Sequence, residues 1–371
     1  MNKIFKIIII IFSLKNLLKV KFLGINCANY FIINDNHNLI DKRSSFFFKI
    51  EDCKKTFNLI RLSQVNYQVF RNILKIPNFF CYSIIKELII NNFNKKKFVN
   101  LILNLFFFLK IKKFILIDDK REMLLFSEIS KKLNIETMIY MHGRLSKNTF
   151  ILKKSFFKKY LVWSDFFLNQ LKKANNRYNK NNVEIVGNPY LIHHKNFKNS
   201  KNKIKIKRAL ILDEDFINYR DIEIYLKKIV EIKNIKLFIK KKITRKLPKE
   251  YYDFCIRNNI KMIEGGENLG RTIKKYKFDC IIASTSTGLL EGMFYHIIPI
   301  KINSNNKERE KEFKEFVNQK FVFYANNQKS FSFFLKKEYS TKQIIKNKKK
   351  LWGNKMFVKK EVNNLVKNFL N

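Results

Sequence analysis

Short apolar runs that alternate with helix-like segments constrain this chain more than any other feature. From residue 113 onward, runs of four or five mostly apolar residues recur, and most of them end in Asp, Ser, Asn or Gly. The run 113–117 precedes Asp118 and Asp119, and 121–133 then has apolar residues at helical spacing. Strands that alternate with helices form βα units, and these units build parallel sheets.

The series of apolar runs is interrupted once, between residues 195 and 208. Here the composition changes to Lys, Asn and Ser, and we interpret this stretch as a linker. A length of 371 residues also favours two domains. We predict an α/β fold with two Rossmann-like, doubly wound domains, residues 1–195 and residues 205–350, that face a cleft. A C-terminal helix, residues 351–371, is predicted to follow, and packing of this helix against the first domain is one option. The segment from 329 to the end is predicted to be helical only. The predicted strands are 31–35, 57–60, 113–117, 137–140, 160–163, 183–186, 209–212, 235–239, 260–263, 279–283, 297–302 and 321–324.

The strongest candidate for a binding site is the turn after the predicted strand 279–283. The sequence there continues Ser284-Thr285-Ser286-Thr287-Gly288, and a helix is predicted to follow. Ligands of open parallel sheets bind beyond the carboxyl ends of the strands, and a helix N-terminus with small hydroxyl residues favours phosphate. A purely structural alternative is equally consistent with the pattern, because Ser286 or Thr287 is also a good helix cap.

A second candidate follows the predicted strand 137–140, where His142, Gly143 and Arg144 are consecutive. A neutral imidazole is suited to accept a proton from an attacking hydroxyl group near pH 7. Gly143 permits close approach, and Arg144 is suited to bind a phosphate or a carboxylate. A structural histidine beside a solvated arginine is the alternative.

Other polar patterns at strand ends are weaker. Asp213-Glu214-Asp215 matches the short DxD pattern that holds a metal over a diphosphate, but three residues match by chance often. Lys240 lies at a strand end in a chain that is rich in lysine. The sequence contains neither GxxxxGK[ST] nor GxGxxG, which disfavours a P-loop ATPase and a dinucleotide oxidoreductase.

The net charge is +46, from 76 Lys and Arg against 30 Asp and Glu. Such a surplus is typical of proteins that bind nucleic acid, anionic membranes or phosphate groups. Lys, Asn, Ile and Phe are frequent throughout the chain, however, and an AT-rich coding sequence produces the same bias. Most of the 38 Phe fall on apolar, core-like faces rather than between lysines on a surface. We therefore expect no nucleic-acid partner, and keep peripheral contact with an anionic membrane as an option.

Two apolar stretches near the N-terminus, 7–14 and 98–109, are shorter than the roughly 20 residues that a membrane helix needs. Lys15 and Lys19 follow the first stretch, where a signal peptide would have a small-residue cleavage site. We predict an initial buried strand or a surface-lying segment at the start, a core helix at 98–109, and a cytoplasmic protein, peripheral at the inner membrane face as one option. The five Cys form no CxxC pair, which argues against a zinc ribbon.

The order of four motifs resembles the GT-B fold glycosyltransferases. The motifs are MHG (141–143), YLVWSD (160–165), VGNP (186–189) and IIASTSTGLLEGMFYHIIPIKI (281–302). The chain is most similar to the capsule and teichoic-acid polymerase-like and polysialyltransferase-like enzymes of bacterial surface-polysaccharide synthesis, over about residues 110–330.

This resemblance implies an N-terminal acceptor domain and a C-terminal domain for a nucleotide-activated sugar donor. It implies that His142 is the catalytic base, with Gly143 and Arg144 as acceptor or phosphate contacts. Related polymerases often carry a His-Pro pair where this chain has Lys240 and Lys241, so one of these lysines would have to supply the missing cation. The implied contacts to the donor phosphates and nucleotide are Ser284, Ser286, Thr287, Gly288, Gly265 and Gly266, with Glu291 on the ribose.

We therefore predict an enzyme that moves a sugar or a sugar-phosphate-like unit from a nucleotide-activated donor to a surface-glycan or lipid-linked acceptor, without a metal ion or another cofactor. A nucleotide-sugar 2-epimerase of the same fold is an alternative. It would need several carboxylates around the donor sugar, and Asp118, Asp119 and Glu122 supply only a few. A basic nucleic-acid-binding protein and an inactive transferase are further alternatives.

Overall fold

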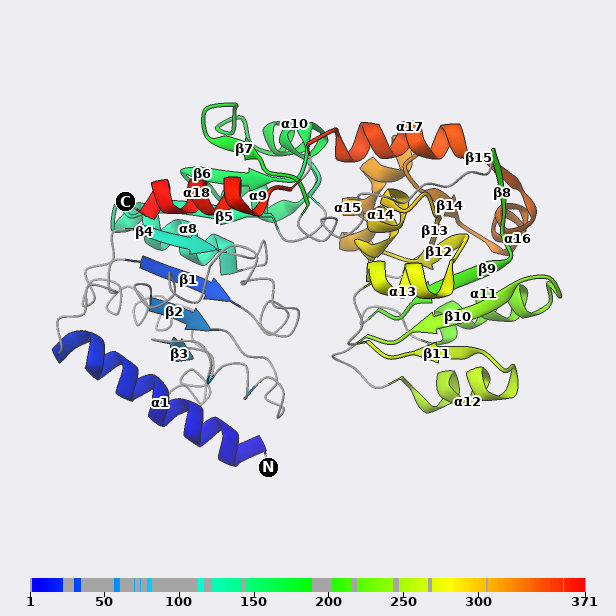
Figure 1. The fold of residues 1–371 in the computed structure, drawn as a ribbon, viewed down its shortest axis with the longest axis horizontal. Helices are drawn as coiled ribbons and strands as arrows, with labels where there is room; N and C mark the ends of the chain where they lie inside the picture. Colours follow the sequence, from blue (N-terminus) through cyan, green and yellow to red (C-terminus); the bar gives the residue numbers. More distant parts are fainter. Residues whose placement is uncertain are drawn as a thin grey trace.

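The computed structural model contains two parallel sheets that lie side by side (Figure 1). The residues it describes are 2–22, 30–34, 57–60, 70, 74, 79–81, 113–116, 122–141, 145–188, 202–214, 219–242, 247–265, 269–304, 306–355 and 357–370. The α/β fold with two doubly wound sheets is confirmed. The domain boundaries at 195 and 205 stay predictions.

The N-terminal sheet has seven parallel strands in the order β3-β2-β1-β4-β5-β6-β7. Its central strands form from runs such as Phe114–Leu116 that are buried on both faces, as parallel strands covered by helices must be. The strands are β1 (Tyr30–Asn34), β2 (Phe57–Ile60), β3 (Phe79–Cys81), β4 (Lys113–Leu116), β5 (Glu136–Tyr140), β6 (Lys159–Val162) and β7 (Val183–Ile185). The helices between them are α8 (Glu122–Lys132), α9 (Phe150–Lys154) and α10 (Asp165–Ala174).

The C-terminal sheet has six parallel strands in the order β11-β10-β9-β12-β13-β14. The strands are β9 (Arg208–Leu212), β10 (Lys236–Lys240), β11 (Lys261–Ile263), β12 (Cys280–Ala283), β13 (Ile298–Ile302) and β14 (Phe323–Ala325). The helices are α11 (Tyr219–Val230), α12 (Lys249–Arg257), α13 (Leu269–Tyr276), α14 (Gly288–Phe294), α15 (Lys307–Asn318) and α16 (Gln328–Lys336). In Figure 1 the strands of both sheets point toward the middle of the molecule.

The prediction that the chain is helical only after residue 329 is wrong. Strand β15 (Glu338–Ser340) pairs antiparallel with β8 (Lys203–Lys205), which lies within the stretch interpreted as a linker. Tyr339 and Ile204 lie opposite each other in this ribbon, and both are buried between exposed polar neighbours. A single buried position in each strand gives too short an alternation to be recognised from the sequence.

The start of the chain forms a helix, α1 (Asn2–Phe22), and the alternative of an initial buried strand is wrong. α1 lies against β3, the edge strand of the N-terminal sheet, where Asn16 Nδ2 donates to the Phe79 carbonyl over 3.0 Å. The predicted helix 98–109 lies outside the described residues. Among the helices that the structure describes, none has the length and apolar character of a membrane span.

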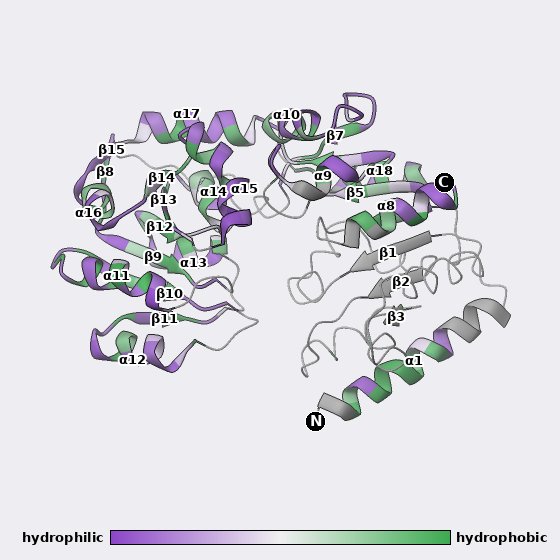
Figure 2. Ribbon diagram, turned by 180° about the vertical axis from the view of Figure 1, so that it is seen from behind, coloured by the Kyte–Doolittle hydropathy of each residue, from purple (hydrophilic) through white to green (hydrophobic). Residues whose placement is uncertain are grey.

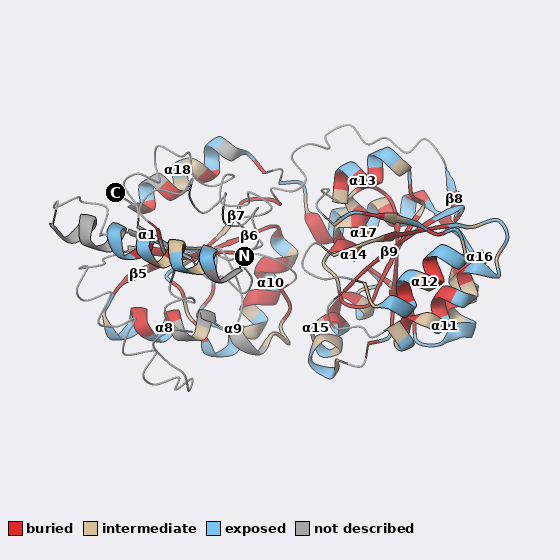
Figure 3. Ribbon diagram, turned by 90° about the horizontal axis from the view of Figure 1, so that it is seen from below, coloured by how far each residue is buried: buried red, intermediate tan, exposed pale blue. Residues whose placement is uncertain are grey.

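The last two helices, α17 (Thr341–Trp352) and α18 (Lys359–Leu370), connect the two sheets. Trp352 at the end of α17 packs at 5.5 Å, ring centre to ring centre, from Trp163, which follows β6. Its indole N–H donates to the Leu290 carbonyl of α14 over 3.2 Å. α18 lies beside the N-terminal sheet, with the Lys113 ammonium 5.9 Å from the Phe369 ring. One cluster of buried residues includes members of both sheets, and Figure 3 shows buried segments in both halves of the molecule.

Candidate functional site

The carboxyl ends of the C-terminal strands form one polar edge. The register pairs Lys240 with Leu212, and Ala283 with Lys301, so the residues that follow these strands lie at the same level. The strand order reverses between β9 and β12. In doubly wound sheets, ligands bind at this switch point.

The turn from β12 to α14 presents unpaired hydrogen-bond donors at the switch point. Ser284 is fully buried, and its hydroxyl oxygen has no hydrogen-bond partner among the described residues. Within the same part of the structure, the amide N–H groups of Ser286 and Thr287 also make no hydrogen bond. Buried polar groups without a hydrogen-bond partner are rare in proteins. A bound ligand would supply the partner that the Ser284 hydroxyl lacks among the described residues.

The capping alternative for this turn is partly correct. Ser286 Oγ accepts from the Gly288 N–H over 3.1 Å, which is a local turn of the kind that starts helices. Thr287 is the N-cap of α14, yet its side chain makes no capping hydrogen bond. The Ser286 hydroxyl oxygen is thus engaged locally, whereas the Thr287 hydroxyl contributes nothing to the cap.

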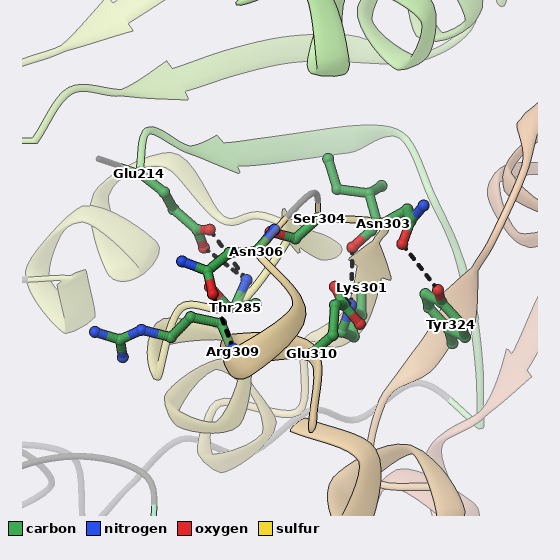
Figure 4. Close-up of polar contacts among 10 residues, drawn as sticks. Glu214, Thr285, Lys301, Asn303, Ser304, Asn306, Arg309, Glu310 and Tyr324 are labelled. Atoms are coloured by element: carbon green, nitrogen blue, oxygen red, sulfur yellow. Dashed lines mark hydrogen bonds and ion pairs between the residues drawn. The ribbon is translucent and has the colours of Figure 1, made fainter. Parts of the chain in front are cut away.

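Glu214, which follows β9, binds the turn across the switch point (Figure 4). Its two carboxylate oxygens accept from the Thr285 N–H over 3.1 and 3.0 Å, and both residues are buried. The neighbouring Asp213 accepts from the Lys242 N–H over 3.3 Å. The two described carboxylates of the DxD-like stretch therefore bind backbone amides, and Asp215 lies outside the described residues. Nowhere in the described residues do three His, Cys, Asp or Glu side chains gather as a metal site.

Gly288 has a packing role that the sequence did not reveal. A Cβ atom at this position would lie 2.5 Å from Leu212 Cδ1 and 3.2 Å from Leu269 Cδ2. The glycine therefore allows α14 to approach β9 closely, which brings the turn next to Glu214. Gly292, one helical turn later, meets Ile281 in the same way, at 2.7 Å.

Lys240 and Gly265 lie together at the far side of the polar edge. The Lys240 ammonium donates to the Glu264 carbonyl over 3.1 Å and to the Gly265 carbonyl over 3.5 Å. Lys241 pairs with the Glu264 carboxylate at 2.7 Å. Lys240 thus fastens the end of β10 to the end of β11, and Gly266 lies outside the described residues.

Glu291 lies half-buried in the first turn of α14. Burial, and in second place the negative charge of Glu291, raise the pKa of Tyr295 well above its usual range. Glu291 and Tyr295 are four residues apart, so they lie on the same side of α14.

A buried lysine at the end of β13 was missed in the sequence analysis. Lys301 is 1% exposed, its ammonium pairs with the Glu310 carboxylate at 2.6 Å, and it lies 4.5 Å from the centre of the Tyr324 ring. Figure 4 shows this group beside the Glu214 contact. The sequence pattern that could have predicted this residue is a single charged side chain within the otherwise apolar run 297–302. A lysine in a buried strand needs a partner of opposite charge.

Three motifs of the N-terminal half meet at the carboxyl edge of its sheet. The Trp163 indole N–H donates to the Tyr140 hydroxyl over 2.9 Å, and that hydroxyl lies 3.5 Å from the Gly187 carbonyl that it donates to. Gly187 has a φ of 77°, in the left-handed region that favours glycine. Residues in or beside the segments MHG, YLVWSD and VGNP are therefore neighbours in space, because Tyr140 directly precedes the first segment and Trp163 and Gly187 belong to the other two.

His142, Gly143 and Arg144 lie outside the described residues, between the buried residues Met141 and Leu145. Asp118 and Asp119 also lie outside them, and Glu122 begins α8. The structure therefore places Ser284, Ser286, Thr287 and Gly288 in one turn and joins Lys240 to Gly265 along the same edge of the sheet, and it does not describe the proposed base.

The segment that follows residues 142–144 is attached to α15 of the C-terminal half. Lys147 pairs with the buried Glu315 at 3.4 Å, and the Lys147 N–H donates to Gln170, which in turn donates to Glu315 over 3.4 Å. Burial raises the pKa of Glu315, but hydrogen bonds from Lys147, Gln319 and Gln170 outweigh it, so the pKa is lowered overall. Asn148 also donates to the Lys311 carbonyl over 3.0 Å. The residues just after His142 thus contact the half that carries the β12–α14 turn.

Comparison with solved structures identifies the fold as GT-B. The chain is similar to Acinetobacter baumannii MurG, with a TM-score of 0.55 and 7% identity, covering 91% of this chain and 99% of that one. It is similar to S. aureus MnaA solved with UDP, with a TM-score of 0.58, 10% identity, and coverage of 92% and 96%. It is also similar to the UDP-GlcNAc 2-epimerase of Methanocaldococcus jannaschii in complex with UDP-GlcNAc and UDP, with a TM-score of 0.54, 15% identity, and coverage of 91% and 98%. No protein-family model and no curated protein matches the sequence.

Proposed function

We propose that the chain is a glycosyltransferase that takes a sugar, or a sugar-phosphate-like unit, from a nucleotide-activated donor. The observation that carries this proposal is the buried Ser284 hydroxyl at the switch point of a GT-B fold, for which the described residues offer no hydrogen-bond partner. The unpaired N–H groups of Ser286 and Thr287 lie beside it. Together these donors suit the diphosphate of a nucleotide-sugar, which is the kind of molecule bound in the M. jannaschii structure.

The proposed chemistry divides between the two halves of the chain. His142 accepts the proton of the acceptor hydroxyl, and Arg144 neutralises nearby phosphate. The turn Ser284–Gly288 stabilises the negative charge that develops on the leaving diphosphate, because its donors are already oriented before the reaction. Glu291 accepts from the ribose hydroxyl groups. The acceptor is a surface glycan or a lipid-linked glycan, and contact with an anionic membrane accompanies this role.

Binding of the donor can be tested at Ser284. Ser284→Ala removes a hydroxyl that has no hydrogen-bond partner in the part of the chain that the structure describes, so the free energy of unfolding should stay the same or rise slightly. If this hydroxyl binds a charged phosphate, affinity for UDP or a UDP-sugar should fall by about tenfold. Thermal-shift titration measures both quantities. Ser130→Ala, at a buried serine of α8, is the matched control. Unchanged nucleotide affinity in Ser284→Ala would contradict the proposal.

The base is tested separately. His142→Ala should abolish transfer to an acceptor and leave nucleotide affinity nearly unchanged, because the proposed role of His142 concerns only the acceptor. A variant that still transfers the sugar would show that another group takes the proton.

A nucleotide-sugar 2-epimerase is the second candidate, and the likeness to the M. jannaschii enzyme favours it. The two functions differ in their need for an acceptor. Incubation of the purified protein with UDP-GlcNAc alone separates them, because an epimerase converts the nucleotide-sugar without a second substrate and a transferase does not.

A further inference from the structure

The outer face of α1 carries an exposed apolar row. Its members are Ile4, Ile7, Ile11 and Leu14, with 61%, 56%, 59% and 47% of their surface exposed. Spacings of three and four residues place them on one side of the helix, over about 15 Å. We call these four residues the outer row. Figures 2 and 3 show that α1 is both apolar and exposed.

The opposite face of α1 already packs against the protein. Ile9 and Ser13 are fully buried, and Asn16 binds the Phe79 carbonyl of β3. Phe5 stacks on Phe70 with 4.6 Å between ring centres. The outer row is therefore a second apolar face of α1. Large exposed apolar side chains on the C-terminal helices α11, α12 and α16 do not form such a row.

We propose that the outer row inserts into the surface of an anionic lipid bilayer, with α1 lying parallel to the membrane. Apolar side chains flanked by cations on a surface helix are suited to the boundary between lipid headgroups and acyl chains. All the ionisable side chains of α1 are lysines, at positions 3, 6, 15, 19 and 21. The net charge of +46 also attracts an anionic surface, and it opposes pairing with a second copy of this chain.

The position of α1 in the molecule is compatible with contact between this helix and a lipid bilayer. α1 lies on the side of the molecule away from α10 and α17, which contact each other between the two halves (Figure 1). A bilayer that contacts the outer row would therefore leave this connection free. The inference does not depend on the transferase function, because lipid binding and nucleotide binding are measured independently.

The test uses vesicle sedimentation with the full chain. Vesicles of phosphatidylcholine mixed with phosphatidylglycerol are compared with vesicles of phosphatidylcholine alone. The double variant Ile7→Asn with Ile11→Asn keeps every lysine, so it separates apolar insertion from general charge attraction. The matched control is Ile224→Asn with Val230→Asn, at two exposed positions of α11.

We expect the α1 variant to bind the mixed vesicles at least about tenfold more weakly than the wild type, and the control to bind like the wild type. A second variant, Ile4→Gln with Leu14→Gln, should reproduce the loss, and circular dichroism should show native helix content in both. Equal vesicle binding by wild type and both α1 variants would overturn the proposal. So would a wild-type dimer that these variants dissociate without any change in lipid binding.

Discussion

The sharpest prediction concerns the stability of the protein in mild acid, which His296 should control. His296 is 9% exposed, and its Nε2 atom lies 3.4 Å from the Lys348 ammonium. Burial, and in second place the positive charge of Lys348, lower the pKa of His296 from 6.5 to about 4. The folded protein therefore keeps this imidazole neutral under conditions in which the unfolded chain protonates it.

The sign and size of the effect follow from linkage. Because the folded pKa is depressed, the unfolded state binds more protons between about pH 6.5 and pH 4, and stability is lost as the pH falls through this window. The whole shift corresponds to about 3 kcal/mol, and at about pH 5 roughly 2 kcal/mol of it should already be lost.

The assay is denaturant unfolding at about pH 7.5 and about pH 5 for the wild type and for His296→Asn. Asparagine suits this position because residue 296 has a φ of 59°, which asparagine tolerates. The variant should lose roughly 2 kcal/mol less than the wild type between the two pH values. Carboxylates that also titrate contribute equally to both proteins and cancel in the difference. An identical loss in both proteins would refute the reasoning.

Two further predictions concern packing and charge in the C-terminal half. Gly288→Ala should lower the free energy of unfolding by about 1–3 kcal/mol, because the new Cβ would overlap Leu212 Cδ1. Leu212→Val should therefore cost less stability in the Gly288→Ala background than in the wild type. Additive costs of the two substitutions in a double-mutant cycle would exclude this overlap. Glu310→Ala should cost about 3 kcal/mol because it leaves the buried Lys301 ammonium without its carboxylate, and replacing Lys301 by Met in the same chain should recover part of the loss in denaturant unfolding. No recovery would show that the pair is not the cause.

Much of the sheet architecture was predictable because buried parallel strands are local features of a sequence. The run 279–283 was predicted as a strand, and β12 occupies 280–283. The same holds for β10 and β13. The elements that were missed have weak local patterns: β15 buries only Tyr339, and α15 has only Phe313 and Phe316 as buried apolar residues among charged ones.

The sequence by itself determined where the strands end and which polar residues follow them, because hydrophobic periodicity and turn residues act over a few neighbours. Only the tertiary structure decided which of these ends meet. Glu214 and Thr285 are 71 residues apart in the chain, yet the strand order places β9 beside β12 and joins them by hydrogen bonds. The pairing of Lys301 with Glu310 and the second face of α1 likewise depend on what packs nearby. Contacts of this kind arise from the way the sheet is assembled, and no local pattern encodes them.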